Sequence, residues 1–165
     1  MNICLLSDTH SYLDPAVLHW ANKCDEIWHA GDIGSLELAH RLAEVKPLRA
    51  VYGNIDDREI RLEYPEDQLF ECEGASVFMT HIGGYPGRYA KGIRARVAQL
   101  RPSLFICGHS HILRIQKDEK LGVFHLNPGA CGRVGFHQVR TLMILTLEER
   151  TLTDLKVVEL GPRTG

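Results

Sequence analysis

The feature that most constrains the fold is a repeated unit in which a short apolar run ends at a polar cluster and is followed by a helical pattern. Residues 3–6 form such a run, and a continuous apolar run of this length is typical of a strand buried on both faces. Asp14 followed by Pro15 predicts the start of a helix, with Asp14 as its N-cap. The run at residues 26–29 begins a second unit. Two such units in sequence predict a parallel β-sheet with helices packed on it.

The remainder of the chain is richer in strand patterns. Ser35 predicts the N-cap of a helix that ends before Pro47, and residues 88–99 predict a further helix. Strands are predicted at residues 48–52, 69–72, 77–80, 104–107, 112–116, 123–126, 142–147 and 152–158. We expect one domain over residues 1–160 and a short C-terminal tail over residues 161–165.

Composition excludes several classes of partner. The 165 residues include 44% hydrophobic and 24% charged residues, as in an ordinary globular domain, and the formal net charge is −2. This charge creates no field that would draw the chain to nucleic acid or to an anionic membrane. We therefore expect neither as a partner, and the oligomeric state stays open.

The cysteines and the first residues of the chain favour a cytoplasmic protein. The five cysteines show no Cys-x-x-Cys spacing, and Cys4 and Cys107 lie in apolar runs, so reduced and buried thiols are expected. The first residues lack the basic region and the cleavage site of a signal peptide, and no apolar run is long enough to span a bilayer.

Two pairs of side chains with metal-binding chemistry follow predicted strands. Asp8 and His10 are two residues apart, and His109 and His111 repeat this spacing. Side chains at i and i+2 of an extended chain point the same way, so each pair converges on one point. Gly108 before the second pair removes a Cβ that would crowd a tight turn.

Three more donors, Asp32, Asn54 and His81, also follow predicted strands. The ends of parallel strands share one edge of a sheet, so all seven donors are expected to be neighbours. Imidazole, carboxylate and amide groups without thiolate suit manganese, iron or zinc rather than magnesium or calcium. Seven donors exceed the needs of one tetrahedral ion, so two ions that share a carboxylate fit better.

The order of these motifs resembles that of the calcineurin-like metallophosphoesterases. The matching segments are Asp8-x-His10, Gly31-Asp32, Gly53-Asn54-x-Asp56, His81 and Gly108-His109-x-His111. Asn127-Pro128-Gly129 extends the resemblance toward the small single-domain phosphodiesterases of bacteria and archaea. The resemblance covers residues 1–160 and implies an α/β fold in which two β-sheets pack face to face with flanking helices.

The resemblance also implies a role for each donor. One metal would be held by Asp8, His10 and His111, the other by Asn54, His81 and His109, and Asp32 would bridge them. The expected cofactor is therefore two divalent ions, with Mn²⁺ as first choice and Fe or Zn as alternatives. A hydroxide between ions about 3.5 to 4 Å apart would attack the phosphorus of a small phosphate ester. We assign catalytic roles to Asp32, Asn54 and His81, and Asn54 would also contact the substrate.

The chain departs from the family pattern at one position that bears on mechanism. The residue after the motif asparagine is often a histidine that protonates the leaving group, and here it is Ile55. The role of Asp56, which usually partners that histidine, is therefore open between catalysis and a structural cap. Arg58 and Arg133 lie close to the motifs and are candidate substrate contacts, since arginine suits phosphate.

Three functions were weighed against the donor set. The favoured one is a dinuclear metal-dependent phosphoesterase, most simply a phosphodiesterase. The alternative is a catalytically weak metal-binding scaffold or interaction protein, because a retromer subunit of similar fold acts as an interaction module. A scaffold has no reason to keep all seven donors. A single-metal hydrolase of amide or acyl bonds would need fewer ligands.

Overall fold

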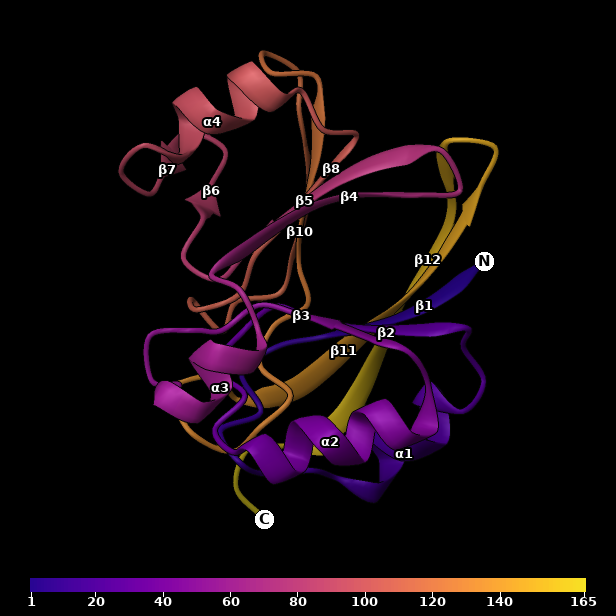
Figure 1. The fold of residues 1–165 in the computed structure, drawn as a ribbon, viewed down its shortest axis with the longest axis vertical. Helices are drawn as coiled ribbons and strands as arrows, with labels where there is room; N and C mark the ends of the chain where they lie inside the picture. The colour runs from indigo at the N-terminus through magenta and orange to yellow at the C-terminus, as the bar shows by residue number, and fades with distance from the viewer.

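The apolar run at residues 3–6 forms β1, the central strand of the first of two five-stranded sheets in the computed structural model, which describes residues 1–165 (Figure 1). In spatial order this sheet, sheet A, consists of β12 (Thr151–Pro162), β11 (Val139–Glu148), β1 (Asn2–Leu6), β2 (Glu26–His29) and β3 (Leu48–Ala50). The strands β1, β2 and β3 are parallel, as the repeated unit predicts, and β11 pairs antiparallel with β1.

The second sheet, sheet B, is also mixed. Its spatial order is β4 (Asp67–Cys72), β5 (Ala75–Thr80), β8 (Leu104–Ile106), β10 (Val123–Asn127) and β9 (Arg114–Asp118). The three inner strands are parallel, and each edge strand is antiparallel to its neighbour. A separate two-stranded hairpin contains β6 (Gly84–Tyr85) and β7 (Arg88–Tyr89).

Four helices complete the fold: α1 (Pro15–Ala21), α2 (Leu36–Val45), α3 (Arg58–Glu63) and α4 (Ile93–Leu100). The predicted N-caps are confirmed. The Asp14 carboxylate accepts a hydrogen bond from the amide of Ala16 at 2.8 Å, and the Ser35 hydroxyl accepts one from the amide of Leu38 at 3.3 Å. Such caps satisfy backbone donors that the first helical turn leaves free.

Alternating residues of β1 show how the layers pack. Ile3 and Leu5 face the core shared with sheet B, while Cys4 and Leu6 join the core formed with α1 and α2. In Figure 1 these two helices cover the outer side of sheet A, and α4 lies on the far side of sheet B. The predicted α/β class, with two sheets face to face and flanking helices, is confirmed.

Two details of the prediction are wrong. The helix predicted over residues 88–99 begins only at Ile93, because Gly84, Gly87 and Gly92 have positive φ angles and make the turns of the β6–β7 hairpin and its exit. The short helix α3, which Asp57 caps through a 3.1 Å bond from the amide of Ile60, was not predicted.

The C-terminal segment is ordered beyond the expected domain end at residue 160. Strand β12 continues to Pro162, and the amide of Arg163 donates to the carbonyl of Gln138 at 2.9 Å. The five cysteines are free and buried, as predicted. None of the helices is long and apolar enough to cross a membrane.

Candidate metal centre

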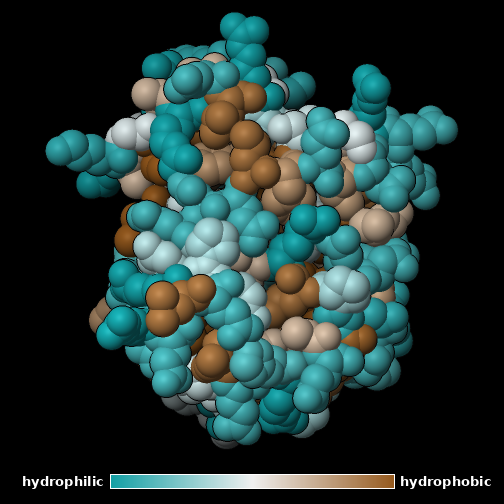
Figure 2. All heavy atoms as spheres, viewed as in Figure 1, coloured by the Kyte–Doolittle hydropathy of each residue, from teal (hydrophilic) through white to brown (hydrophobic).

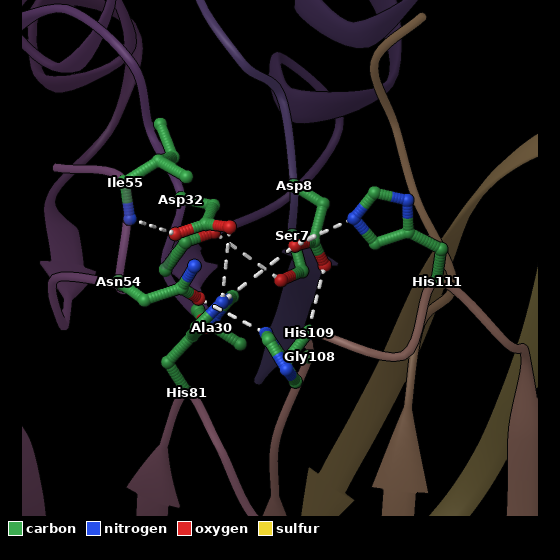
Figure 3. A network of polar contacts seen from close by, with 12 residues as sticks. Ser7, Asp8, Ala30, Asp32, Asn54, Ile55, His81, Gly108, His109 and His111 are labelled. Carbon is green, nitrogen blue, oxygen red and sulfur yellow. Dashed lines mark hydrogen bonds and ion pairs between the residues drawn. The ribbon is translucent and has the colours of Figure 1, made fainter. Parts of the chain in front are cut away.

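The seven predicted donors lie where the carboxyl ends of the two sheets meet. Asp8, Asp32 and Asn54 follow strands β1, β2 and β3 of sheet A, whereas His81 and His109 follow strands β5 and β8 of sheet B. The expectation of one shared sheet edge is therefore wrong in detail, since the edges of two sheets converge. Figure 3 shows that side chains from both sheet edges point into a common space.

The backbone at these positions is unusual. Five of the seven donors have φ angles between 46° and 67°, namely Asp8, His10, Asp32, His109 and His111. Residues other than glycine seldom adopt this left-handed region, and each instance costs of order 1–3 kcal/mol. Such conformations cluster at functional sites, where the surrounding structure holds side chains in a required direction.

Six of the donors form two groups of three whose ligand atoms lie within 4.8 Å of one another. The first group contains Asp8, His10 and His111, and the second contains Asp32, His81 and His109. In the first group, Oδ1 of Asp8 lies 3.2 Å from Nε2 of His111 and 4.0 Å from Nε2 of His10.

The carboxylates of Asp8 and Asp32 each lie close to histidines of both groups. Oδ2 of Asp32 lies 3.2 Å from Nε2 of His81 and 3.5 Å from Nε2 of His10, so one oxygen stands between histidines of different groups. Oδ1 of Asp8 also lies 3.8 Å from Nε2 of His81. The centre is therefore one continuous cluster rather than two separate ones.

The chemistry of the donor set fits bound cations. Oδ1 of Asp8 and the Nε2 atoms of His10 and His81 are buried and have no hydrogen-bond partner. An unpaired buried polar atom normally costs about 1–3 kcal/mol, and native structures contain few of them. These three unpaired atoms are explained if cations bind at the cluster and accept their lone pairs.

Local contacts orient His81 for this role. Its Nδ1 donates to the carbonyl of Ala30 at 2.7 Å, which leaves the lone pair of Nε2 facing the cluster. Burial would lower the pKa of His81, but the nearby carboxylates of Asp32 and Asp8 raise it above the usual value. The field at this atom therefore favours positive charge.

Asn54 joins the second group through His109. Oδ1 of Asn54 lies 2.9 Å from Nδ1 of His109, and the amide of Ile55 donates to Oδ1 of Asp32 at 3.0 Å. The loop after β3 thus contacts one donor from each sheet (Figure 3). All seven predicted donors are brought together.

Asp56 is a structural residue. Its carboxylate accepts three backbone hydrogen bonds, from Ile33 at 3.1 Å and from Gly34 and Gly53 at 2.8 Å each. The side chain is 3% exposed. This arrangement ties the loop after β2 to the loop after β3, so the reading of Asp56 as a cap is the one that its contacts support.

Two glycines permit the close packing of these loops. A Cβ at Gly53 would overlap Oδ1 of Asp32, and a Cβ at Gly108 would overlap the hydroxyl of Ser7 and lie 2.8 Å from Oδ2 of Asp8. The predicted role of Gly108 as a position that admits no side chain is therefore confirmed, because the hydroxyl of Ser7 and the carboxylate of Asp8 fill the space.

The two arginines predicted to contact substrate are exposed. Arg58 is the first residue of α3, and the guanidinium of Arg133 lies 4.2 Å over the ring of Tyr12. No hydrogen bond or ion pair joins either of them to the seven donors. Arg61 was not predicted, yet its Nη2 donates to the carbonyl of Asn54 at 3.2 Å. No motif marks it, because its position depends on α3.

Two histidines outside the motif set also support the centre. The ring of His29 accepts a hydrogen bond from the amide of Gly31 at 3.1 Å and contacts the hydroxyl of Thr9 at 3.0 Å, and burial lowers its pKa to about 4. His137 packs edge-on against His111 with ring centroids 5.2 Å apart. His40 pairs instead with Glu63 on the surface.

Comparison with known proteins defines the class. Residues 1–150 match the model of the calcineurin-like phosphoesterase superfamily domain, and the chain belongs to this superfamily. It is 33% identical over 135 residues to a probable metallophosphoesterase of Methanothermobacter thermautotrophicus, covering 79% of this chain and 77% of that protein.

Solved structures agree on the fold. Wild-type Vps29 of Entamoeba histolytica, determined in complex with Zn²⁺, aligns with a TM-score of 0.75 at 16% identity and covers 99% of this chain and 100% of its own. The phosphoesterase YfcE of E. coli aligns with a TM-score of 0.61 at 20% identity and covers 94% of this chain and 98% of its own. At these identities the likeness concerns the fold alone.

Proposed function

We propose that this protein is a dinuclear metal-dependent phosphodiesterase that hydrolyses a small organic phosphate ester. The observation that carries the proposal is the position of Asp32, whose Oδ2 lies within 3.5 Å of Nε2 of His10 and within 3.2 Å of Nε2 of His81. One carboxylate oxygen between two groups of ligands is the arrangement that a bridged pair of cations requires.

The assignment of ligands follows the two groups. One cation would be held by Asp8, His10 and His111, the other by His81, His109 and Asn54, with Asp32 between them. Mn²⁺ is our first choice because the donors mix nitrogen and oxygen, and Fe or Zn²⁺ would also suit them. Zn²⁺ is bound by the E. histolytica protein of the same fold.

The chain's own residues would orient the substrate and the ligands. Bound cations of this kind supply charge neutralisation at the phosphoryl oxygens and an activated water. Asn54 stands at the open side of the centre, where its amide can contact a phosphoryl oxygen while Oδ1 stays close to His109. Asp32 is kept ionised, because burial raises its pKa but His81 and the amide of Ile55 lower it further.

A scaffold function is the second candidate, and one surface feature favours it. Four exposed apolar residues lie on two segments that adjoin His111, namely Ile112, Leu113, Val134 and Phe136. Exposed apolar side chains of this kind often mark interaction surfaces. A scaffold would not need the buried unpaired atoms of the centre, so we rank it below the enzyme.

The test is an activity screen with added Mn²⁺ or Zn²⁺. We expect hydrolysis of bis(p-nitrophenyl) phosphate, and a loss of at least about 10²-fold in kcat/KM for Asp32→Ala, because the shared ligand is removed. Asp154→Ala on the exposed face of β12 is the matched control and should keep the wild-type rate. Folded, metal-loaded protein without activity on any phosphate ester would favour the scaffold instead.

A further inference from the structure

A cavity of about 540 Å³ adjoins the candidate metal centre. Asn54 and His81 line it, so two proposed ligands face the cavity, and His81 is only 3% exposed with Nε2 unpaired. The opposite wall comes from the segment at residues 90–96, where α4 begins. Cavities of this size accommodate small organic ligands. A substrate bound at the centre can therefore extend a further group into it.

The walls of the cavity differ in character. Tyr52, Ile82 and Ile93 provide apolar surface. The charged groups are Arg61, Glu66, Asp67, Lys91 and Arg96. In Figure 2 the surface between α3 and the hairpin–α4 region is mostly hydrophilic, whereas apolar atoms gather over α3 and beneath α4.

Two of the positively charged side chains, Lys91 and Arg61, have N–H groups that no carboxylate of the chain occupies. Arg96 is paired with Asp67, but Lys91 has no carboxylate within 4.0 Å. Arg61 is fixed by bonds from Nε to the carbonyl of Asp56 at 2.7 Å and from Nη2 to the carbonyls of Asn54 at 3.2 Å and Gly53 at 3.5 Å, and it stacks on Tyr52 at 4.6 Å. The N–H groups of Nη1 are left free. With Glu66 as the remaining anion, the free charge of the cavity is positive.

The start of α4 adds to this positive charge. Its N-cap is Gly92, which has a φ angle of 80° and no side chain to cap the helix. No acidic residue lies in the first turn, where Arg94 is found instead. Helix N-termini carry partial positive charge and normally attract acidic side chains. Here the N-terminus, Lys91 and Arg61 line a cavity in which Glu66 is the one carboxylate that is not already paired.

We propose that the substrate carries a second anionic group, a phosphate or a carboxylate, which lies in this cavity near Lys91 while the scissile phosphate lies at the metal centre. This inference rests on the proposed phosphoesterase function for the position of the scissile group. The apolar wall would contact the organic part between the two anions, and Arg61, beside Asn54, would lie between the two sites.

The test compares diesters that differ only in the second anion. The probes are the p-nitrophenyl ester of thymidine 5′-phosphate, the same ester with a 3′-phosphate, and the same ester with a 3′-succinyl group. With Mn²⁺-loaded protein we expect kcat/KM for nitrophenolate release to rise roughly tenfold with the preferred 3′ anion, the value of one charge-assisted contact. The two anionic esters distinguish a phosphate from a carboxylate.

Lys91→Gln should remove most of this preference and leave the rate for the plain ester within about twofold. Lys23→Gln, an equal charge change at an exposed position beside Trp20, is the control and should keep the preference. Equal rates for the three esters, or a preference that survives in Lys91→Gln, would overturn the inference.

A binding measurement separates this inference from the proposed function. By calorimetry, thymidine 3′,5′-bisphosphate should bind metal-loaded wild-type protein roughly tenfold more tightly than thymidine 5′-phosphate, and Lys91→Gln should bind both equally. Absence of hydrolysis with this binding difference intact would reject the phosphodiesterase and keep the second anion site. Equal affinities in wild-type protein would reject the second site.

Discussion

Ile55 occupies the position at which the resemblance to the phosphoesterase family places a histidine that protonates the leaving alcohol. It is 47% exposed, and its backbone amide is bound to Asp32. Isoleucine cannot transfer a proton, and positioned acids contribute typically 10²–10⁴-fold to rate. The proposed phosphodiesterase should therefore hydrolyse aryl esters, whose leaving group departs unaided, far better than alkyl esters.

Ile55→His should raise the ratio of alkyl to aryl kcat/KM, since only the alkyl leaving group needs a proton. The gain should stay below about 10²-fold, because the carboxylate of Asp56 is buried and already accepts three backbone hydrogen bonds, so it is poorly placed to orient the new ring. The ratio cancels any change in the amount of loaded enzyme. An unchanged ratio in fully metal-loaded protein would show that another group supplies the proton.

At the scale of elements, Asp56 connects the loops that follow β2 and β3. Asp56→Ala should lower the free energy of unfolding by roughly 3 kcal/mol, because three buried amides lose a charged acceptor. It should also weaken metal binding, since Asp32 and Asn54 lie on the loops that move. Denaturant unfolding and a metal titration on the same protein would measure both effects.

Asp57→Ala is the matched control for this variant. It removes the N-cap of α3 and should cost about 1 kcal/mol, without changing metal affinity. If Asp56→Ala kept wild-type metal affinity, the two loops would be shown to hold their positions without this carboxylate.

The elements also show what sequence can and cannot predict. The helix starts at Asp14 and Ser35 were predictable, because capping depends on a few adjacent residues. That the seven candidate donors lie close together was predictable, because each one follows a predicted strand. The hairpin at residues 84–89 was not, since its strands are only two residues long and the second of them lies in the segment whose spacing predicts a helix. Arg61 could not be found, because only tertiary structure brings it to Asn54.

At the scale of the whole molecule, the periodicity of the chain predicts a parallel sheet but not the packing of one sheet on another. The face-to-face packing of two sheets was expected only from the resemblance to a family. This packing brings donors from both sheets to one site. Sheet A supplies Asp8, His10, Asp32 and Asn54, and sheet B supplies the other three donors. The contact between the amide of His109 and Oδ2 of Asp8, at 3.2 Å, joins residues 101 positions apart.

Bound cations would therefore connect the two sheets, and binding to the native state alone stabilises it by mass action. The most direct test is a titration of metal-free protein with Mn²⁺, in which bound metal per chain and the rate of bis(p-nitrophenyl) phosphate hydrolysis are followed together. We expect two ions to bind per chain and the rate to reach its plateau only when the second is bound. A full rate with a single ion per chain, or two ions bound with no hydrolysis, would contradict this expectation.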